Sequence, residues 1–141
     1  MPEGGKMRRK RNYVEFEDDS GITRRYVPHG HGGGLVETSA KVHPSAYVRA
    51  GAYVDPGARV DPDAHIDAGA WVDYGAVIGA GARVGENAHV GARAVVGNRA
   101  VVAAYAKVGA EARIGEGTRL SADDVIAPGS LISQRRMSPA A

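Results

Sequence analysis

The sequence predicts an all-β solenoid, in which short parallel strands stack coil upon coil along one axis. The first observation is a six-residue repeat that runs without insertion from Val36 to Ile132. The second is an alanine two residues before each repeating aliphatic from Val42 to Ile114. The third is the composition: only 6% of the 141 residues are aromatic, which leaves little material for a conventional core of large side chains.

The repeat unit, Ala-x-(Val/Ile)-x-x-x, explains how the chain turns. Residues two apart in an extended segment point to the same side, so the alanine and the aliphatic face inward and the residue between them faces outward. Glycine and proline recur in the remaining positions, where they favour turns. Three units close a triangle. The aliphatic positions are Val36, Val42, Val48, Val54, Val60, Ile66, Val72, Ile78, Val84, Val90, Val96, Val102, Val108, Ile114, Leu120, Ile126 and Ile132.

The first segment, residues 1–11, is predicted to be a basic disordered tail. No apolar stretch follows it, so it does not have the pattern of a secretory signal. Its basic side chains either keep the chain soluble or bind an acidic partner. They are Lys6, Arg8, Arg9, Lys10 and Arg11. Residues 134–141 form a second predicted tail.

Residues 12–34 are predicted to form a β-hairpin cap and a glycine-rich linker. Two short alternating segments flank the turn signal at 18–21, which is typical of a hairpin over residues 12–27. A solenoid leaves unpaired backbone at its end, and an atypical terminal element of this kind can cover it. His29 and His31 lie in the linker, where a glycine-rich hinge explains them better than a metal site.

Residues 36–132 resemble the hexapeptide-repeat family. This resemblance implies a left-handed parallel β-helix of triangular cross-section, with about five to six coils over residues 35–133, and it implies a homotrimer. The left hand comes from the family, because spacing alone does not determine it. The N-terminal hairpin precedes the helix.

The outward residues of successive coils form three columns. The first holds Leu35, Tyr53, Trp71, His89, Lys107 and Val125. The second holds Lys41, Arg59, Val77, Val95, Arg113 and Leu131. The third holds Tyr47, His65, Arg83, Val101 and Arg119. Exposed apolar strips mark contacts between subunits or with partners. The predicted interface residues are therefore Tyr53, Trp71, His89, Val77 and Val95.

Neither a metal site nor a cofactor is predicted. The chain has no cysteine. The γ-class carbonic anhydrases of this family use two histidines five residues apart in one chain, and no such pair occurs here. Four aspartates follow the repeating aliphatics and are interpreted as turn caps rather than as a cation site. They are Asp55, Asp61, Asp67 and Asp73.

The functional prediction weighs two resemblances. Acyltransferases of the family need a histidine base, usually placed by a loop that leaves the coil, and this repeat has no such interruption; His89 is the best candidate and His65 the second. The segment from Gly33 to Glu37 (GGLVE), preceded by a hairpin, resembles the start of the repeats in small non-enzymatic hexapeptide-repeat proteins, many of them from bacteriophages. We therefore expect a structural or binding module without an active site. The alternative is an acyltransferase that uses coenzyme A, with His89 as base.

The expected partners follow from this interpretation. They are two further copies of the chain and a larger protein assembly, such as a virion that the protein decorates as a capsid or fibre-like component through its termini. The net charge of +2 argues against nucleic acid, and no apolar run is long enough for a membrane span. The expected location is the cytoplasm or the virion.

Overall fold

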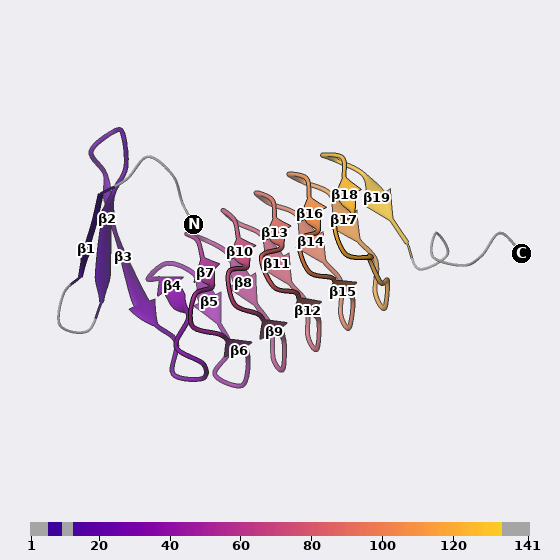
Figure 1. Cartoon of the computed structure of the whole chain (residues 1–141), viewed down its shortest axis with the longest axis horizontal. Helices are drawn as coiled ribbons and strands as arrows, with labels where there is room; N and C mark the ends of the chain where they lie inside the picture. The colour runs from indigo at the N-terminus through magenta and orange to yellow at the C-terminus, as the bar shows by residue number, and fades with distance from the viewer. Residues whose placement is uncertain (1–5, 10–12, 134–141) are drawn as a thin grey trace, which may run out of the picture.

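The structure is a computed structural model that describes residues 6–9 and 13–133. Over this part of the chain it is entirely strands and turns, and so contains no helix that could cross a membrane. A hairpin stands at one end of a stack of coils, and the C-terminal strands lie at the other end (Figure 1).

The hairpin comes first and continues into the coils. Strands β1 (Lys6–Arg9), β2 (Val14–Glu17) and β3 (Thr23–Pro28) pair antiparallel. Asp18 forms the turn between β2 and β3, because its carboxylate accepts hydrogen bonds from the backbone N–H of Ser20 and of Ile22. The predicted hairpin is confirmed. Strand β1 lies within the segment expected to be a disordered tail and extends the hairpin; Lys10 and Arg11 lie outside the described residues.

The coils build three parallel sheets, one on each face of a prism. The first face, which the hairpin joins through β3 and β4, contains β4 (Leu35–Glu37), β7 (Tyr53–Val54), β10 (Trp71–Val72), β13 (His89–Val90), β16 (Lys107–Val108) and β18 (Val125–Ile126). The second contains β5 (Lys41–Val42), β8 (Arg59–Val60), β11 (Val77–Ile78), β14 (Val95–Val96), β17 (Arg113–Ile114) and β19 (Leu131–Ile132). The third contains β6 (Tyr47–Val48), β9 (His65–Ile66), β12 (Arg83–Val84) and β15 (Val101–Val102).

The register confirms the three predicted columns. Trp71 pairs with Tyr53 on one side and His89 on the other, and Val77 pairs with Val95. Each outward side chain therefore lies directly above the equivalent residue of the coil before it. The outcome is a β-solenoid of about five turns, as the repeat predicts.

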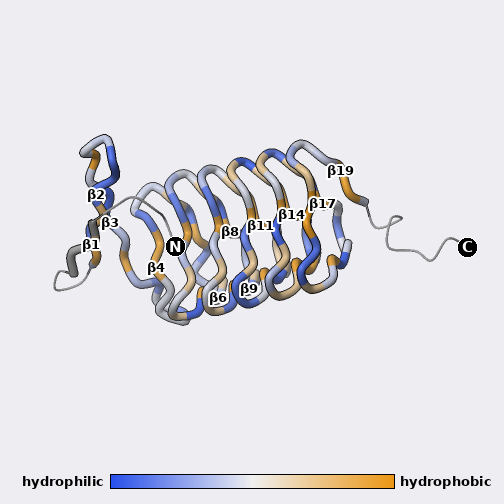
Figure 2. Tube along the Cα trace, turned by 45° about the horizontal axis from the view of Figure 1, so that its top comes forward, coloured by the Kyte–Doolittle hydropathy of each residue, from blue (hydrophilic) through white to orange (hydrophobic). Residues whose placement is uncertain are grey.

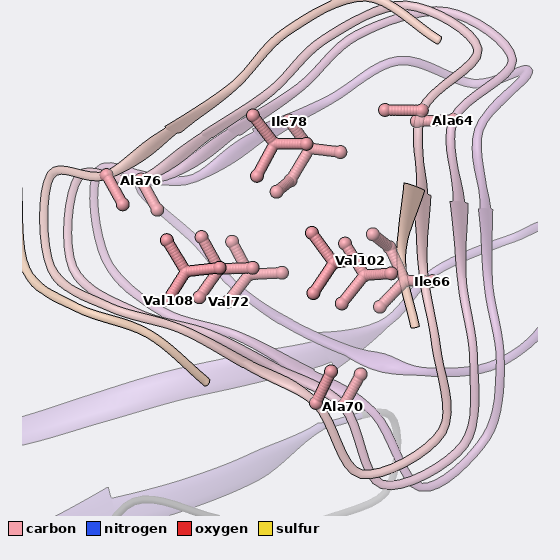
Figure 3. Close-up of a cluster of buried hydrophobic side chains, with 14 of the residues drawn as sticks. Ala64, Ile66, Ala70, Val72, Ala76, Ile78, Val102 and Val108 are labelled. Atoms are coloured by element: carbon pink, nitrogen blue, oxygen red, sulfur yellow. The ribbon is translucent and has the colours of Figure 1, made fainter. Parts of the chain in front are cut away.

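The core consists of the repeating aliphatics and alanines. Every such aliphatic from Val48 to Ile126 is buried, and most have no exposed surface. Figure 3 shows Val72, Ile66 and Ile78 pointing inward from the three sides of a coil, with alanines near the corners. Hydrophobic and polar residues alternate along each coil (Figure 2). A two-residue strand buries one side chain, and β-branched residues suit that extended backbone.

Most corners between strands adopt a left-handed backbone. Glycine fills several of them with positive φ, for example Gly57 at 72° and Gly81 at 67°. Other residues adopt the same conformation at equivalent corners: Asp63, Asn87, Arg93, Arg99, Tyr105, Glu111 and Asp123.

The glycine-rich linker packs tightly against the first coil. His29 Nε2 lies 2.8 Å from the carbonyl oxygen of Ala46, and the Gly34 N–H donates to Val48 at 2.8 Å. A Cβ at Gly34 would lie 2.4 Å from a methyl carbon of Val48. Close backbone approach, rather than flexibility, thus explains the glycine.

Candidate functional site

The candidate site centres on His89, which projects from β13 on the first face. Its Nε2 lies 3.0 Å from Oδ2 of Asp73, which follows β10 on the preceding coil. Its ring stacks on the indole of Trp71, with centroids 4.1 Å apart and planes inclined by 14°. The His89 side chain is 33% exposed, so the ring is held on two sides yet remains accessible.

Asp73 determines which nitrogen of His89 carries the proton. Burial raises the pKa of Asp73, but the hydrogen bonds from His89 and from the backbone N–H of Tyr74 outweigh it and lower that pKa below its ordinary value. An ionised carboxylate only accepts hydrogen bonds, so Nε2 must donate. In the neutral ring Nδ1 then carries the lone pair, and the described part of the chain provides no partner for it. His89 is therefore oriented as a base.

A second carboxylate lies behind the first, one coil nearer the hairpin. Asp55 is 4% exposed and accepts two hydrogen bonds of 2.6 Å, from the Tyr26 hydroxyl and from Nε1 of Trp71. Burial raises the pKa of Asp55, although both hydrogen bonds oppose the rise. Burial and the neighbouring Asp55 also raise the pKa of Tyr26, so its hydroxyl stays a donor.

The interpretation of the four aspartates as turn caps needs correction. Asp55 is a buried acceptor for side chains rather than a turn cap, because the hairpin and Trp71 cover it. Asp61 pairs with Arg59, and Asp67 pairs with His65 on the third face. The Asp73 carboxylate does accept a hydrogen bond from the backbone N–H of Tyr74, as a turn cap would, but it also hydrogen-bonds the His89 ring.

A groove of about 320 Å³ begins at Asp73 and His89 and runs along the first face. Lys107 stands one coil beyond His89 and lines the groove, as do Val125 and Pro128 on the next coil. The groove thus offers a base, a cation and an apolar wall in that order.

The five predicted interface residues lie in three different surroundings. The Tyr53 ring packs at 6.2 Å from Phe16 and 6.3 Å from Tyr26, so the chain's own hairpin partly covers it. Trp71 and His89 form the stacked pair described above. Val77 and Val95 are half-buried neighbours on the second face. The basic residues of β1 lie in the hairpin sheet.

A second histidine–aspartate pair occurs on the third face. His65 Nε2 lies 2.8 Å from Oδ1 of Asp67, and its ring stacks on Tyr47 with centroids 4.8 Å apart. His65 does not line the nearby groove of about 400 Å³, which includes Asp67, Arg49 and Arg83. No group of three or more metal-ligating side chains occurs among residues 6–9 and 13–133.

Comparison with solved structures relates the chain to acetyltransferases. It is similar to a mutant of perosamine N-acetyltransferase from Caulobacter crescentus in complex with CoA and GDP-perosamine, with 28% identity over 69% of this chain and 46% of that one, and a TM-score of 0.68. The acetyltransferase domain of PglB from Neisseria gonorrhoeae aligns at 20% identity over 74% of this chain and 56% of that one (TM-score 0.41).

A hexapeptide transferase family protein from Anaplasma phagocytophilum aligns at 16% identity over 70% and 72% of the two chains (TM-score 0.34). This chain spans about half the length of the acetyltransferase from Caulobacter crescentus and of the domain from Neisseria gonorrhoeae. No family model and no curated protein matches it. The first likeness agrees with a left-handed hexapeptide-repeat β-helix, and it is to an enzyme rather than to a structural module.

Proposed function

We propose that this hexapeptide-repeat β-helix is an acyltransferase that transfers an acyl group from coenzyme A to an amine or hydroxyl acceptor. The observation that carries the proposal is His89, oriented by Asp73 at the head of a groove. The likeness to a CoA-bound N-acetyltransferase supports it further. Nothing in the comparisons supports the capsid or bacteriophage role that the sequence favoured, and they favour its alternative.

His89 acts as the general base in this mechanism. Coenzyme A, when bound, supplies the acyl group as a thioester. Nδ1 of His89 takes a proton from the acceptor as the acceptor's nitrogen or oxygen forms a bond to the thioester carbonyl carbon. The carbon–sulfur bond then breaks, and His89 returns the proton to the departing sulfur. Asp73 keeps Nε2 protonated throughout and stabilises the imidazolium by its negative charge.

The residues along the groove suit the donor. Lys107 offers a cation to a phosphate, and the walls at Val125 and Pro128 suit an apolar arm. Some backbone N–H groups along the groove are already paired with the next coil, for example that of Gly91 with the carbonyl of Val108. The side chains that line the groove therefore supply much of the recognition.

A single prism leaves the groove open on its outer side. We propose that the protein is a homotrimer in which a neighbouring copy covers it. Exposed apolar side chains near the C-terminal end favour such a contact, since Val125 is 74% and Leu131 77% exposed. Light scattering after size exclusion should give three times 14.7 kDa, and a monomer would overturn this assembly.

The test combines binding with turnover. Acetyl coenzyme A should raise the melting temperature of the wild type, because it binds only the folded state. Free thiol should appear when amino sugars linked to nucleoside diphosphates, GDP-perosamine among them, are supplied as acceptors. His89→Asn should lower turnover by about 10²-fold or more, the usual contribution of a general base.

His65→Asn is the matched control, because it removes the other aspartate-bound histidine from a different face. It should leave turnover within about twofold of wild type. A scaffold without catalysis would show neither the thermal shift nor thiol release with any acceptor, and that result would refute the proposal. Full activity in His89→Asn would refute the assignment of the base.

A further inference from the structure

We infer that the N-terminal hairpin positions His89 through a buried hydrogen-bond network formed by Tyr26, Asp55 and Trp71. The catalytic consequence rests on the proposed function, since it assumes that His89 is the base. The contacts themselves are independent of that assumption. Asp55 and Trp71 are thus assigned as positioning residues, and Tyr26 connects them to the hairpin.

The network joins three segments that are distant in the sequence. Tyr26 comes from β3 of the hairpin, Asp55 from the corner after β7, and Trp71 from β10 on the next coil. Each donor bonds a different oxygen of the Asp55 carboxylate: Tyr26 to Oδ1 and Trp71 to Oδ2. The carboxylate is 4% exposed, so water cannot easily replace either donor. A shift of the hairpin would therefore reach the indole.

The indole in turn fixes the plane of the His89 ring. One hydrogen bond to Asp73 leaves the imidazole free to rotate about that bond. The nearly parallel stack on Trp71 removes this freedom, because rotation would break the face-to-face contact. The two contacts together aim Nδ1 in one direction. The other charged group that faces His89 on its sheet is Lys107, and it belongs to the groove.

The hairpin is itself anchored well enough to serve this purpose. The Tyr26 side chain is buried, and the rings of Tyr26 and Phe16 lie 6.3 Å and 6.2 Å from Tyr53 of the first face in edge-to-face contacts. A second contact reaches the site from the same strand: the Arg24 guanidinium lies 5.4 Å from the ring of Tyr74, whose N–H bonds Asp73. The hairpin therefore touches supports of both Trp71 and Asp73.

Trp71 is the only tryptophan in the chain, which makes the test direct. In an NMR spectrum of the full-length protein, its single indole N–H should exchange slowly with solvent and show ring-to-ring contacts with His89. Tyr26→Phe removes one hydroxyl without leaving a cavity and should make the indole N–H exchange at least about tenfold faster. Trp71→Phe keeps a ring but removes the N–H, and should shift the His89 ring resonances.

The kinetic readout separates positioning from simple stability. Tyr26→Phe and Trp71→Phe should lower kcat by about tenfold with little change in the KM for acetyl coenzyme A, because binding groups are untouched. Tyr105→Phe is the matched control: its side chain is exposed and belongs to a different corner, so neither the spectrum nor kcat should change.

The outcomes distinguish this inference from the proposed function. Unchanged indole exchange in Tyr26→Phe, together with unchanged His89 ring resonances in Trp71→Phe, would overturn the network. Altered spectra with unchanged kcat, in an enzyme that His89→Asn inactivates, would overturn the positioning role. Altered spectra in a protein without any acyl transfer would support the control of His89 by the hairpin and refute the proposed function instead.

Discussion

Replacement of Gly85 by alanine tests how closely the coils stack. Gly85 follows β12, and its φ lies outside the left-handed region, so the substitution adds a methyl group without backbone strain. That Cβ would lie 2.6 Å from the backbone nitrogen of Ala104 and 2.8 Å from the carbonyl carbon of Ala103 on the next coil. Both atoms are backbone, so no flexible side chain can move aside.

The cost can be worked out from these distances. Ordinary contact begins near 3.4 Å, so the coils must separate by about 0.8 Å at this corner. The Gly85 N–H bonds the carbonyl of Val102 at 2.6 Å, and the same separation would stretch it to about 3.4 Å, beyond the useful range. A lost hydrogen bond of about 1 kcal/mol and overpacking of about 1–3 kcal/mol give a total of about 2–4 kcal/mol.

Urea unfolding at equilibrium measures this difference in the free energy of unfolding. Gly30→Ala is the control, because a Cβ there meets nothing within 4 Å and the residue has an ordinary φ. It should stay within about 0.5 kcal/mol of wild type. If Gly85→Ala were equally neutral, the close stacking of coils inferred at this corner would be wrong.

Three further predictions concern charge and strain. The pKa of Asp73 is lowered from 3.8, so its contribution to stability is present above that pH and is lost as the pH falls through the folded-state pKa. In urea titrations below about pH 4, the Asp73→Asn variant should therefore lose less of its unfolding free energy than the wild type does. The pKa of Asp55 is raised from 3.8, so the sign is opposite: the stability advantage of wild type over Asp55→Asn is fully present below about pH 4 and should shrink as the pH rises above it. Tyr105 is exposed and has a φ of 63°, so Tyr105→Gly should raise the unfolding free energy by about 0.5–1 kcal/mol; a loss of stability would show that the tyrosine ring outweighs the strain.

The sequence predicted the coils residue by residue, because the repeat has a single phase. An alanine and an aliphatic two residues apart must face the same side, which fixes the inward column and leaves the outward one between them. The pairing of Trp71 with His89 and of Val77 with Val95 follows from that register alone. The corners were predicted only where glycine marks them. Tyr105 and Arg99 adopt the same left-handed backbone, because stacking between coils overrides local preference there.

The candidate site was predicted less completely than the fold. His89 beside Trp71 follows from the column, but the partners Asp73 and Asp55 stand sixteen residues before the side chains they bind. That offset joins the corner of one coil to the next coil's strand, and it is present in the sequence for both pairs. Tyr26 could not be predicted this way, since docking of the hairpin depends on tertiary packing.

The corner that follows each strand of the first face limits where such a site can form. Asp55 and Asp73 occupy this corner on two successive coils, and Gly91 and Gly109 occupy it on the next two. A Cβ at Gly91 would lie 2.7 Å from the carbonyl oxygen of Val108, and one at Gly109 would lie 2.5 Å from the nitrogen of Pro128.

At Gly91 and Gly109, therefore, the stacking of coils leaves no room for a side chain. No carboxylate can hold Lys107 as Asp73 holds His89, and Lys107 is left to line the groove. The change from aspartate to glycine thus divides the face into two parts. The part nearer the hairpin carries two carboxylates that orient rings, Asp55 buried and Asp73 half-buried, and the part beyond it offers an open groove. His89 stands at the boundary, where a base can be both held and reached.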